Sequence, residues 1–182
     1  MNREYNRIGQ LLVRKGLLTE EQVQKALQAQ SECHSRLGEV ISAMGWVSDE
    51  DLATTLAEQF DYEYLDIKGI EPDSEALNVV SGRWALANLV LPLKWNDGRF
   101  EIALSDPIDV KATDEIRQRV RCPLRIYLSV PDALKNSIIR SYTIECEVSP
   151  KKLGKGRRQK IDSQPDRDAI INAVDNVLGG AA

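Results

Sequence analysis

Apolar positions in the first sixty residues recur every three to four residues, which is the period of an amphipathic helix. The stretch Arg7 to Gln30 aligns without a gap on Arg36 to Gln59, at a constant offset of 29 residues. In each copy the apolar positions run up to a glycine, Gly16 or Gly45, where a helix typically ends in the left-handed conformation. The pattern therefore predicts that a helical unit occurs twice in tandem.

A second helix is predicted after each of these glycines. Thr19 is a favourable N-cap, and Gln22 three residues later completes a capping box. Ser48 occupies the equivalent position in the second copy. Each copy is thus expected to form a helical hairpin, with residues 31–35 as the join between the two.

The residues that recur between the copies are of two kinds. The leucines and other apolar residues are explained by packing, since two amphipathic hairpins bury each other's apolar faces. A core does not require arginine and glutamine, which are mostly exposed residue types. An arginine fork matches a phosphate or the O6/N7 edge of guanine, and a nearby glycine lets a ligand approach the backbone. Two copies predict a site for a ligand with two similar halves. The polar and glycine pairs are Arg7/Arg36, Gly9/Gly38 and Gln30/Gln59.

From Tyr62 onward the periodicity becomes mixed, which predicts an α+β fold class: an all-helical tandem-hairpin subdomain followed by a small mixed subdomain. Asn96-Asp97-Gly98 is typical of a tight hairpin turn. The expected elements are strands at 64–67, 90–94, 100–104 and 124–128, and helices at 74–79, 83–87, 112–120 and 131–142.

The composition of the chain argues against several classes of function. The 182 residues are 42% hydrophobic, and 24 Lys+Arg against 28 Asp+Glu give a net charge of −4. This balance argues against non-specific nucleic-acid binding. No apolar run approaches the roughly 18 residues of a membrane span, and the first residues lack the apolar core of a signal peptide, so a cytoplasmic protein without a transmembrane segment is expected.

The few cysteines and histidines argue against several chemistries. Cys33, Cys122 and Cys146 form no close pair, and His34 is the sole histidine, so no disulfide framework, metal site or Ser-His-Asp triad is expected. Gly154-Lys155 lacks the remaining residues of a Walker loop. Asp106 and Asp109 resemble an acid–base pair, but a turn and a helix cap explain them more simply. No catalytic residues are therefore predicted, and the chain is expected not to be an enzyme.

The charge is segregated toward the C-terminal part. Lys151 to Lys160 carry six basic side chains, while residues 1–150 carry 17 Lys+Arg against 24 Asp+Glu. A solvated linker is one interpretation, and contact with acidic phospholipid, nucleic acid or an acidic protein face is another. Asp166 to Leu178 then carry an apolar stripe, which predicts a short helix that docks on its own domain or on a partner. The predicted segments are thus residues 1–60, 61–145, a basic linker at 146–165 and a C-terminal amphipathic helix at 166–182.

The tandem pattern Arg-[Ile/Leu]-Gly, two apolar residues, Gly and a final Leu-x-x-Gln resembles the N-terminal MshEN domain of type II secretion and type IV pilus assembly ATPases. The pattern Val90-Leu91-Pro92-Leu93 followed by Ile102 to Pro107 is similar to the second subdomain of that family. The resemblance covers roughly Arg7 to Tyr142 and does not include the ATPase module.

The resemblance implies a ligand and a function. The tandem motifs of that family bind cyclic di-GMP, so the chain is expected to be a non-enzymatic receptor with no other cofactor, which passes ligand occupancy to a protein partner in a secretion, pilus or motility machine. The alternative is a structural adaptor that binds no nucleotide. By position the binding role falls on Arg7, Ile8, Gly9, Leu27 and Gln30 in the first copy and on Arg36, Leu37, Gly38, Leu56 and Gln59 in the second.

Overall fold

The computed structural model describes residues 3–142, 171–172 and 174, and the chain divides into two compact units at Ser48. The predicted basic linker at 146–165 lies outside the described residues. So does most of the predicted C-terminal helix, of which Ile171, Asn172 and Val174 are helical. Among the helices of the described residues, none has the length and apolar character needed to span a membrane.

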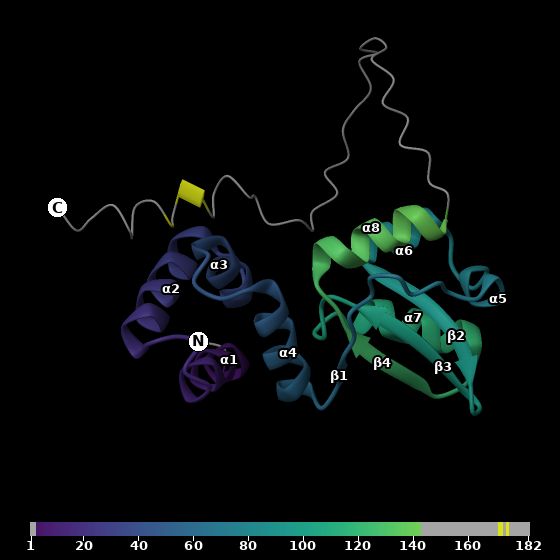
Figure 1. The fold of residues 1–182 in the computed structure, drawn as a ribbon, viewed down its shortest axis with the longest axis horizontal. Coiled ribbons are helices and arrows are strands. Elements are labelled where there is room, and N and C mark those ends of the chain that lie inside the picture. Colours follow the sequence, from purple (N-terminus) through teal and green to yellow (C-terminus); the bar gives the residue numbers. More distant parts are fainter. Residues whose placement is uncertain (1–2, 143–170, 173, 175–182) are drawn as a thin grey trace, which may run out of the picture. The chain divides into compact units, whose positions relative to one another are not determined.

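The first unit contains α1 (Arg3–Arg14), α2 (Glu20–Cys33) and α3 (Leu37–Met44) (Figure 1). The glycine caps are confirmed, with φ of 72° at Gly16 and 66° at Gly45. The capping box at Thr19 is confirmed as well, because Thr19 and Gln22 each bond the backbone N–H of the other. The local residue types therefore predicted where these helices end and restart.

The join between the two copies is shorter than the predicted 31–35. Helix α2 continues to Cys33, and His34 ends it in the left-handed conformation with φ 54°. Its backbone N–H donates to the carbonyl of Gln30 at 2.9 Å. Ser31, Glu32 and Cys33 contain no helix breaker, so the helix extends until this capping bond closes it.

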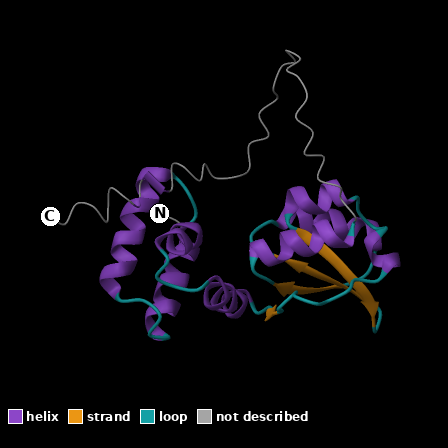
Figure 2. Ribbon diagram, turned by 45° about the horizontal axis from the view of Figure 1, so that its top comes forward, coloured by secondary structure: helices purple, strands orange, loops and turns teal. Residues whose placement is uncertain are grey.

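The second unit is α+β, as predicted, and its sheet has the order β1-β4-β3-β2 (Figure 2). Strands β1, β4 and β3 run parallel, and β2 pairs with β3 in antiparallel orientation. Helices α6 and α8 lie side by side in both ribbon views. The elements are α4 (Asp49–Phe60), β1 (Glu63–Tyr64), α5 (Ser74–Leu77), α6 (Gly82–Asn88), β2 (Val90–Asn96), β3 (Arg99–Leu104), α7 (Val110–Val120), β4 (Leu124–Leu128) and α8 (Pro131–Ser141).

The hairpin between β2 and β3 forms where it was predicted. Asp97 and Gly98 both have positive φ, 49° and 71°, as a tight two-residue turn requires. By contrast, the strand predicted at 64–67 is wrong in its bounds, since β1 has two residues. The carboxylate of Asp66 accepts the backbone N–H of Lys68 at 3.1 Å, and this local turn ends the strand.

Strand β3 lies at the centre of the core of the second unit and is buried on both faces from Phe100 to Leu104. Phe100, Ile102 and Leu104 alternate along the strand and are at most 1% exposed. Ile116 of α7 and Leu134 of α8 are fully buried in the same cluster. The sheet and these helices therefore bury one continuous apolar core.

Helix α4 belongs to this second unit, although the sequence repeat extends to Gln59. It packs against β1 and β4, and its Ala57 is buried in the core of the unit. The packing division at Ser48 thus differs from the predicted boundary at residue 60. The second copy of the repeat is divided, with α3 in one unit and α4 in the other.

Gly82, the first residue of α6, allows a close approach of Tyr142. A Cβ at Gly82 would lie 2.7 Å from the Cβ of Tyr142. The Tyr142 hydroxyl donates to the carbonyl of Leu77 at 3.1 Å, and burial raises the pKa of Tyr142 to about 12. The residue after α8 is therefore fixed against α5 and α6.

Candidate functional site

Three of the predicted site residues are buried in the first unit. Ile8 is 3% exposed and Leu37 is fully buried. A Cβ at Gly9 would lie 2.8 Å from Cγ1 of Val23 and 3.8 Å from Cδ2 of Leu37. Gly9 is needed because α1 and α2 approach closely at this point, so packing alone explains its place in the motif.

Replacing Gly9 with alanine is expected to lower the free energy of unfolding by about 1 to 3 kcal/mol, the range for overpacking a core. Val23 is β-branched and has little freedom to rotate away within a helix. Chemical denaturation measures the effect. The variant Gly9→Ala/Val23→Ala, compared with Val23→Ala, provides the control, because the added methyl group then has room. A Gly9→Ala protein as stable as the original would show that the glycine is not required for packing.

Arg36 and Gln30 lie next to each other at the join of α2 and α3. Arg36 is the N-cap residue of α3 and is exposed, and its backbone N–H donates to Oε2 of Glu39 at 3.1 Å. The side-chain amide of Gln30 donates to the carbonyl of Ser35 at 3.1 Å. An exposed guanidinium beside the start of a helix is an arrangement that favours an anion.

The remaining predicted residues are placed as follows. Arg7 lies within α1, and its side chain is outside the described part of the structure. Leu27 in α2 and Gly38 in α3 are half-buried. Leu56 packs against the core of the second unit, and Gln59 is half-buried in the same helix. The first unit therefore brings together Ile8, Gly9 and Leu37, and separately Gln30 and Arg36, while Leu56 and Gln59 belong to the second unit.

An open groove of about 650 Å³ lies between α1 and α2. Gly9 is the one predicted site residue that lines it. The sequence analysis did not predict the polar residues of the groove as site residues. The signal for them is the helical spacing after Gly9 and Glu20, which places side chains on one face. The lining residues are Gly9, Gln10, Val13, Arg14, Glu20, Val23 and Gln24.

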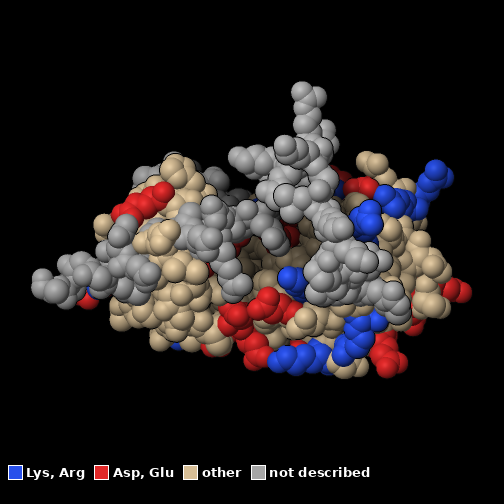
Figure 3. Space-filling view, turned by 90° about the horizontal axis from the view of Figure 1, so that it is seen from above, with Lys and Arg blue, Asp and Glu red and all other residues tan. Residues whose placement is uncertain are grey.

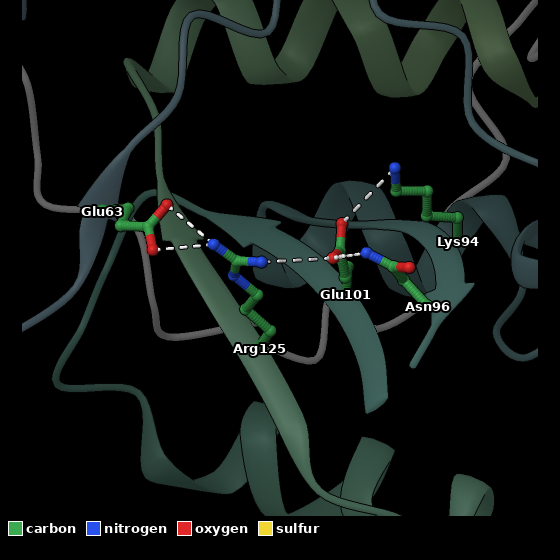
Figure 4. Close-up of polar contacts among 5 residues, drawn as sticks. All are labelled: Glu63, Lys94, Asn96, Glu101 and Arg125. Carbon is green, nitrogen blue, oxygen red and sulfur yellow. Dashed lines mark hydrogen bonds and ion pairs between the residues drawn. The ribbon is translucent and has the colours of Figure 1, made fainter. Parts of the chain in front are cut away.

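Sequence reasoning also missed a polar network on the sheet (Figure 4). Arg125 donates two hydrogen bonds to the carboxylate of Glu63, at 2.8 and 3.1 Å, and this bonding raises the pKa of Arg125. Its other terminal nitrogen lies 3.8 Å from Oε1 of Glu101. Burial and the carboxylate of Glu101 raise the pKa of Tyr127. The signal in the sequence that could have indicated this network is the presence of charged residues within the apolar strands predicted at 100–104 and 124–128.

Acidic side chains dominate the segment of residues 48–75, in which Lys68 is the single basic residue. All of these acidic side chains are exposed, and Figure 3 shows groups of Asp and Glu atoms on the face that it draws. The carboxylates give this segment a negative charge, whereas the join at Arg36 carries a basic side chain. The acidic residues are Asp49, Glu50, Asp51, Glu58, Asp61, Glu63, Asp66, Glu71, Asp73 and Glu75.

Residues 60–145 match the MshEN domain family. The chain is 32% identical over 137 residues to the type IV pilus assembly ATPase PilB of Thermus thermophilus, covering 75% of this chain and 15% of PilB. It is 27% identical over 140 residues to the type II secretion system protein E of Xanthomonas campestris, covering 75% of this chain and 25% of that protein. The chain thus spans a quarter or less of the length of these relatives.

Two solved structures have a similar fold. One is a structure of MshE with cdg, an abbreviation of cyclic di-GMP. It has a TM-score of 0.67 and 26% identity, and the match covers 74% of this chain and 98% of the MshE chain. The N-terminal domain of XpsE has a TM-score of 0.61 and 24% identity, covering 78% and 98% of the two chains. Residues 60–145 therefore match the MshEN domain family, and the chain is similar to the N-terminal regions of the type II secretion and type IV pilus assembly ATPases.

Proposed function

We propose that the chain is a non-enzymatic receptor that binds cyclic di-GMP through its tandem motifs. The observation that carries this proposal is the similarity to MshE solved with that nucleotide, which extends over 98% of the MshE chain. The chain has the motif residues Arg, Gly and Gln in both copies. The proposed site residues remain those that the motifs identify, from Arg7 to Gln30 and from Arg36 to Gln59.

The chemistry of the proposed site follows from its residue types. The guanidinium of Arg36 is exposed at the start of α3 and is suited to a phosphate or to the O6/N7 edge of a guanine. Gln30 adjoins it through its bond to Ser35 and offers an amide that both donates and accepts. Arg7 of the first copy is the counterpart of Arg36, and Gln59 of the second copy is the counterpart of Gln30, so each copy contributes one arginine and one glutamine.

The biological role that we propose is based on the relatives of the chain. Ligand occupancy is passed to a protein partner in a secretion, pilus or motility machine at the cytoplasmic side of the membrane. The matched parts of the relatives are the N-terminal regions of ATPases and not the catalytic module, which supports a regulatory role without enzymatic activity.

Replacing Arg36 with alanine is expected to weaken the binding of cyclic di-GMP by about 1.5 to 3 kcal/mol, or roughly 10- to 150-fold, the scale of a hydrogen bond to a charged group. The melting temperature should change little, since the side chain is exposed. Calorimetric titration measures the affinity, which for the unaltered chain is expected to be micromolar or tighter. Arg83→Ala, on the exposed surface of α6, is the matched control.

Linear pGpG should bind to the unaltered chain more weakly than cyclic di-GMP, because ring closure presents both guanines already arranged.

The structural adaptor without a nucleotide is the second candidate, and a specific observation favours it. Gly9, Leu37 and Leu56 all have packing roles. These roles explain why the residues recur without the need for a ligand. The same titration separates the candidates. Absence of heat at hundred-micromolar cyclic di-GMP would reject the receptor and support the adaptor. If Arg36→Ala unfolds the chain and leaves the affinity of the folded fraction unaltered, the proposed site is wrong.

A further inference from the structure

Charged and polar side chains form a network across all four strands of the sheet (Figure 4). Arg125 on β4 lies between Glu63 on β1 and Glu101 on β3. On the far side of Glu101, the amide of Asn96 donates to Oε1 at 2.9 Å and the ammonium group of Lys94 lies 4.0 Å from Oε2, both from β2. The network therefore links the short strand β1 to the rest of the sheet.

Arg125 is held in place by groups that do not belong to β1. Glu101 is 4% exposed, and the Arg125 guanidinium lies 5.2 Å from the centre of the Tyr127 ring, within reach of a cation–π contact. A planar fork fixed in this way loses little freedom when it binds a second carboxylate. Glu63 consequently meets a prearranged partner, unlike the two mobile side chains of most surface ion pairs.

Strand β1 is short, although Tyr64 and the following Leu65 pack against the core of the unit. It contributes two residues, Glu63 and Tyr64, which pair with β4, and the backbone N–H of Leu65 then donates to the carbonyl of Leu128 at 2.8 Å. The chain enters β1 almost directly from α4, where the N–H of Tyr62 donates to the carbonyl of Ala57 at 2.9 Å. The two hydrogen bonds between Arg125 and Glu63 therefore add a side-chain attachment to the backbone pairing and apolar packing at this junction.

Helix α4 packs against both β1 and β4, and it carries Leu56 and Gln59. We propose that Glu63 and Arg125 form a latch that fixes α4 on the sheet, and that Arg125 is thereby a positioning residue for the second ligand motif. This inference rests on the proposed function, since it assigns to α4 a share in nucleotide binding. Neither residue of the latch belongs to the tandem motifs.

The test combines amide hydrogen exchange with titration of cyclic di-GMP, both on the full chain. Arg125→Gln and Glu63→Gln are expected to speed exchange in α4 and β1, to leave α7 unchanged, and to weaken binding about fivefold, within the range for couplings carried by packed elements. Arg125→Lys keeps the charge without the fork and is expected to give an intermediate affinity. The matched control is Asp114→Asn, which breaks the 2.7 Å ion pair between Arg117 and Asp114 within α7.

Each outcome bears on a different part of the inference. Unchanged exchange in α4 for both latch variants would overturn the latch. Faster exchange with unaltered affinity would overturn the positioning role and leave the proposed function standing. Absence of binding by the unaltered chain would overturn the proposed function together with the positioning role, while the exchange data would still decide whether the latch exists. An equal loss of affinity in Asp114→Asn would show that the effect is not specific to Arg125.

Discussion

Replacing Leu37 with alanine is expected to lower the free energy of unfolding by about 2 to 5 kcal/mol, the cost of truncating a buried leucine. Leu37 is fully buried, and its side chain faces Gly9 in the contact of α1 with α3. A cavity at this place has no side chain on Gly9 to fill it. Denaturant titration followed by circular dichroism measures the loss.

The control for this variant is Leu27→Ala. Leu27 belongs to the first copy of the tandem motif, whereas Leu37 belongs to the second, and Leu27 is half-buried. Its truncation should therefore cost clearly less, since the cost follows the burial of the lost atoms. A Leu37→Ala protein that keeps its stability and loses cyclic di-GMP binding would assign Leu37 to the ligand and not to the core. The pair therefore separates packing from recognition among the leucines of the two copies.

Replacing Phe100 with alanine is expected to lower the free energy of unfolding by about 3 to 5 kcal/mol. Phe100 is the largest fully buried side chain among the described residues, and it lies in the core cluster of the second unit. Its ring centre is 4.6 Å from that of Trp95, which adds an aromatic contact to the area lost. Thermal unfolding monitored by circular dichroism is the measurement.

Trp95→Ala removes the other ring of the same contact and serves as the matched variant. Trp95 is 44% exposed, so its loss should cost less than the loss of Phe100 although the side chain is larger. Equal costs would mean that the aromatic contact, and not burial, dominates at this position. A smaller cost for Phe100 would contradict the core described for β3.

The features predicted correctly from the sequence are those determined within a few residues. A capping box needs only Thr19 and Gln22, and a tight hairpin needs only Asp97 and Gly98, because the bonds that close them are local. The end of α2 was misplaced for a related reason. No breaker marks Cys33, and the residue that ends the helix in the left-handed conformation is His34, not the glycine that usually marks such a position.

The features that could not be predicted depend on contacts between distant residues. Val23 faces Gly9, so the need for glycine appears only when two helices are packed. Glu63 and Arg125 are 62 positions apart, and their pairing depends on strand order in the sheet. The sequence identified the motif residues of the candidate site, but only the packed units distinguish buried Leu37 from exposed Arg36.

The division of the second motif between two units has a consequence for fragments and chimeric proteins. A fragment ending at Gln59 would retain every residue of the tandem repeat and yet remove α4 from the strands on which it packs, leaving Leu56 and Ala57 without their partners in the core of the second unit. Such a piece would expose apolar surface and be prone to association. Exchange of a single repeat between relatives would meet the same obstacle. The unit that was duplicated in the sequence is therefore not a unit that can be transplanted.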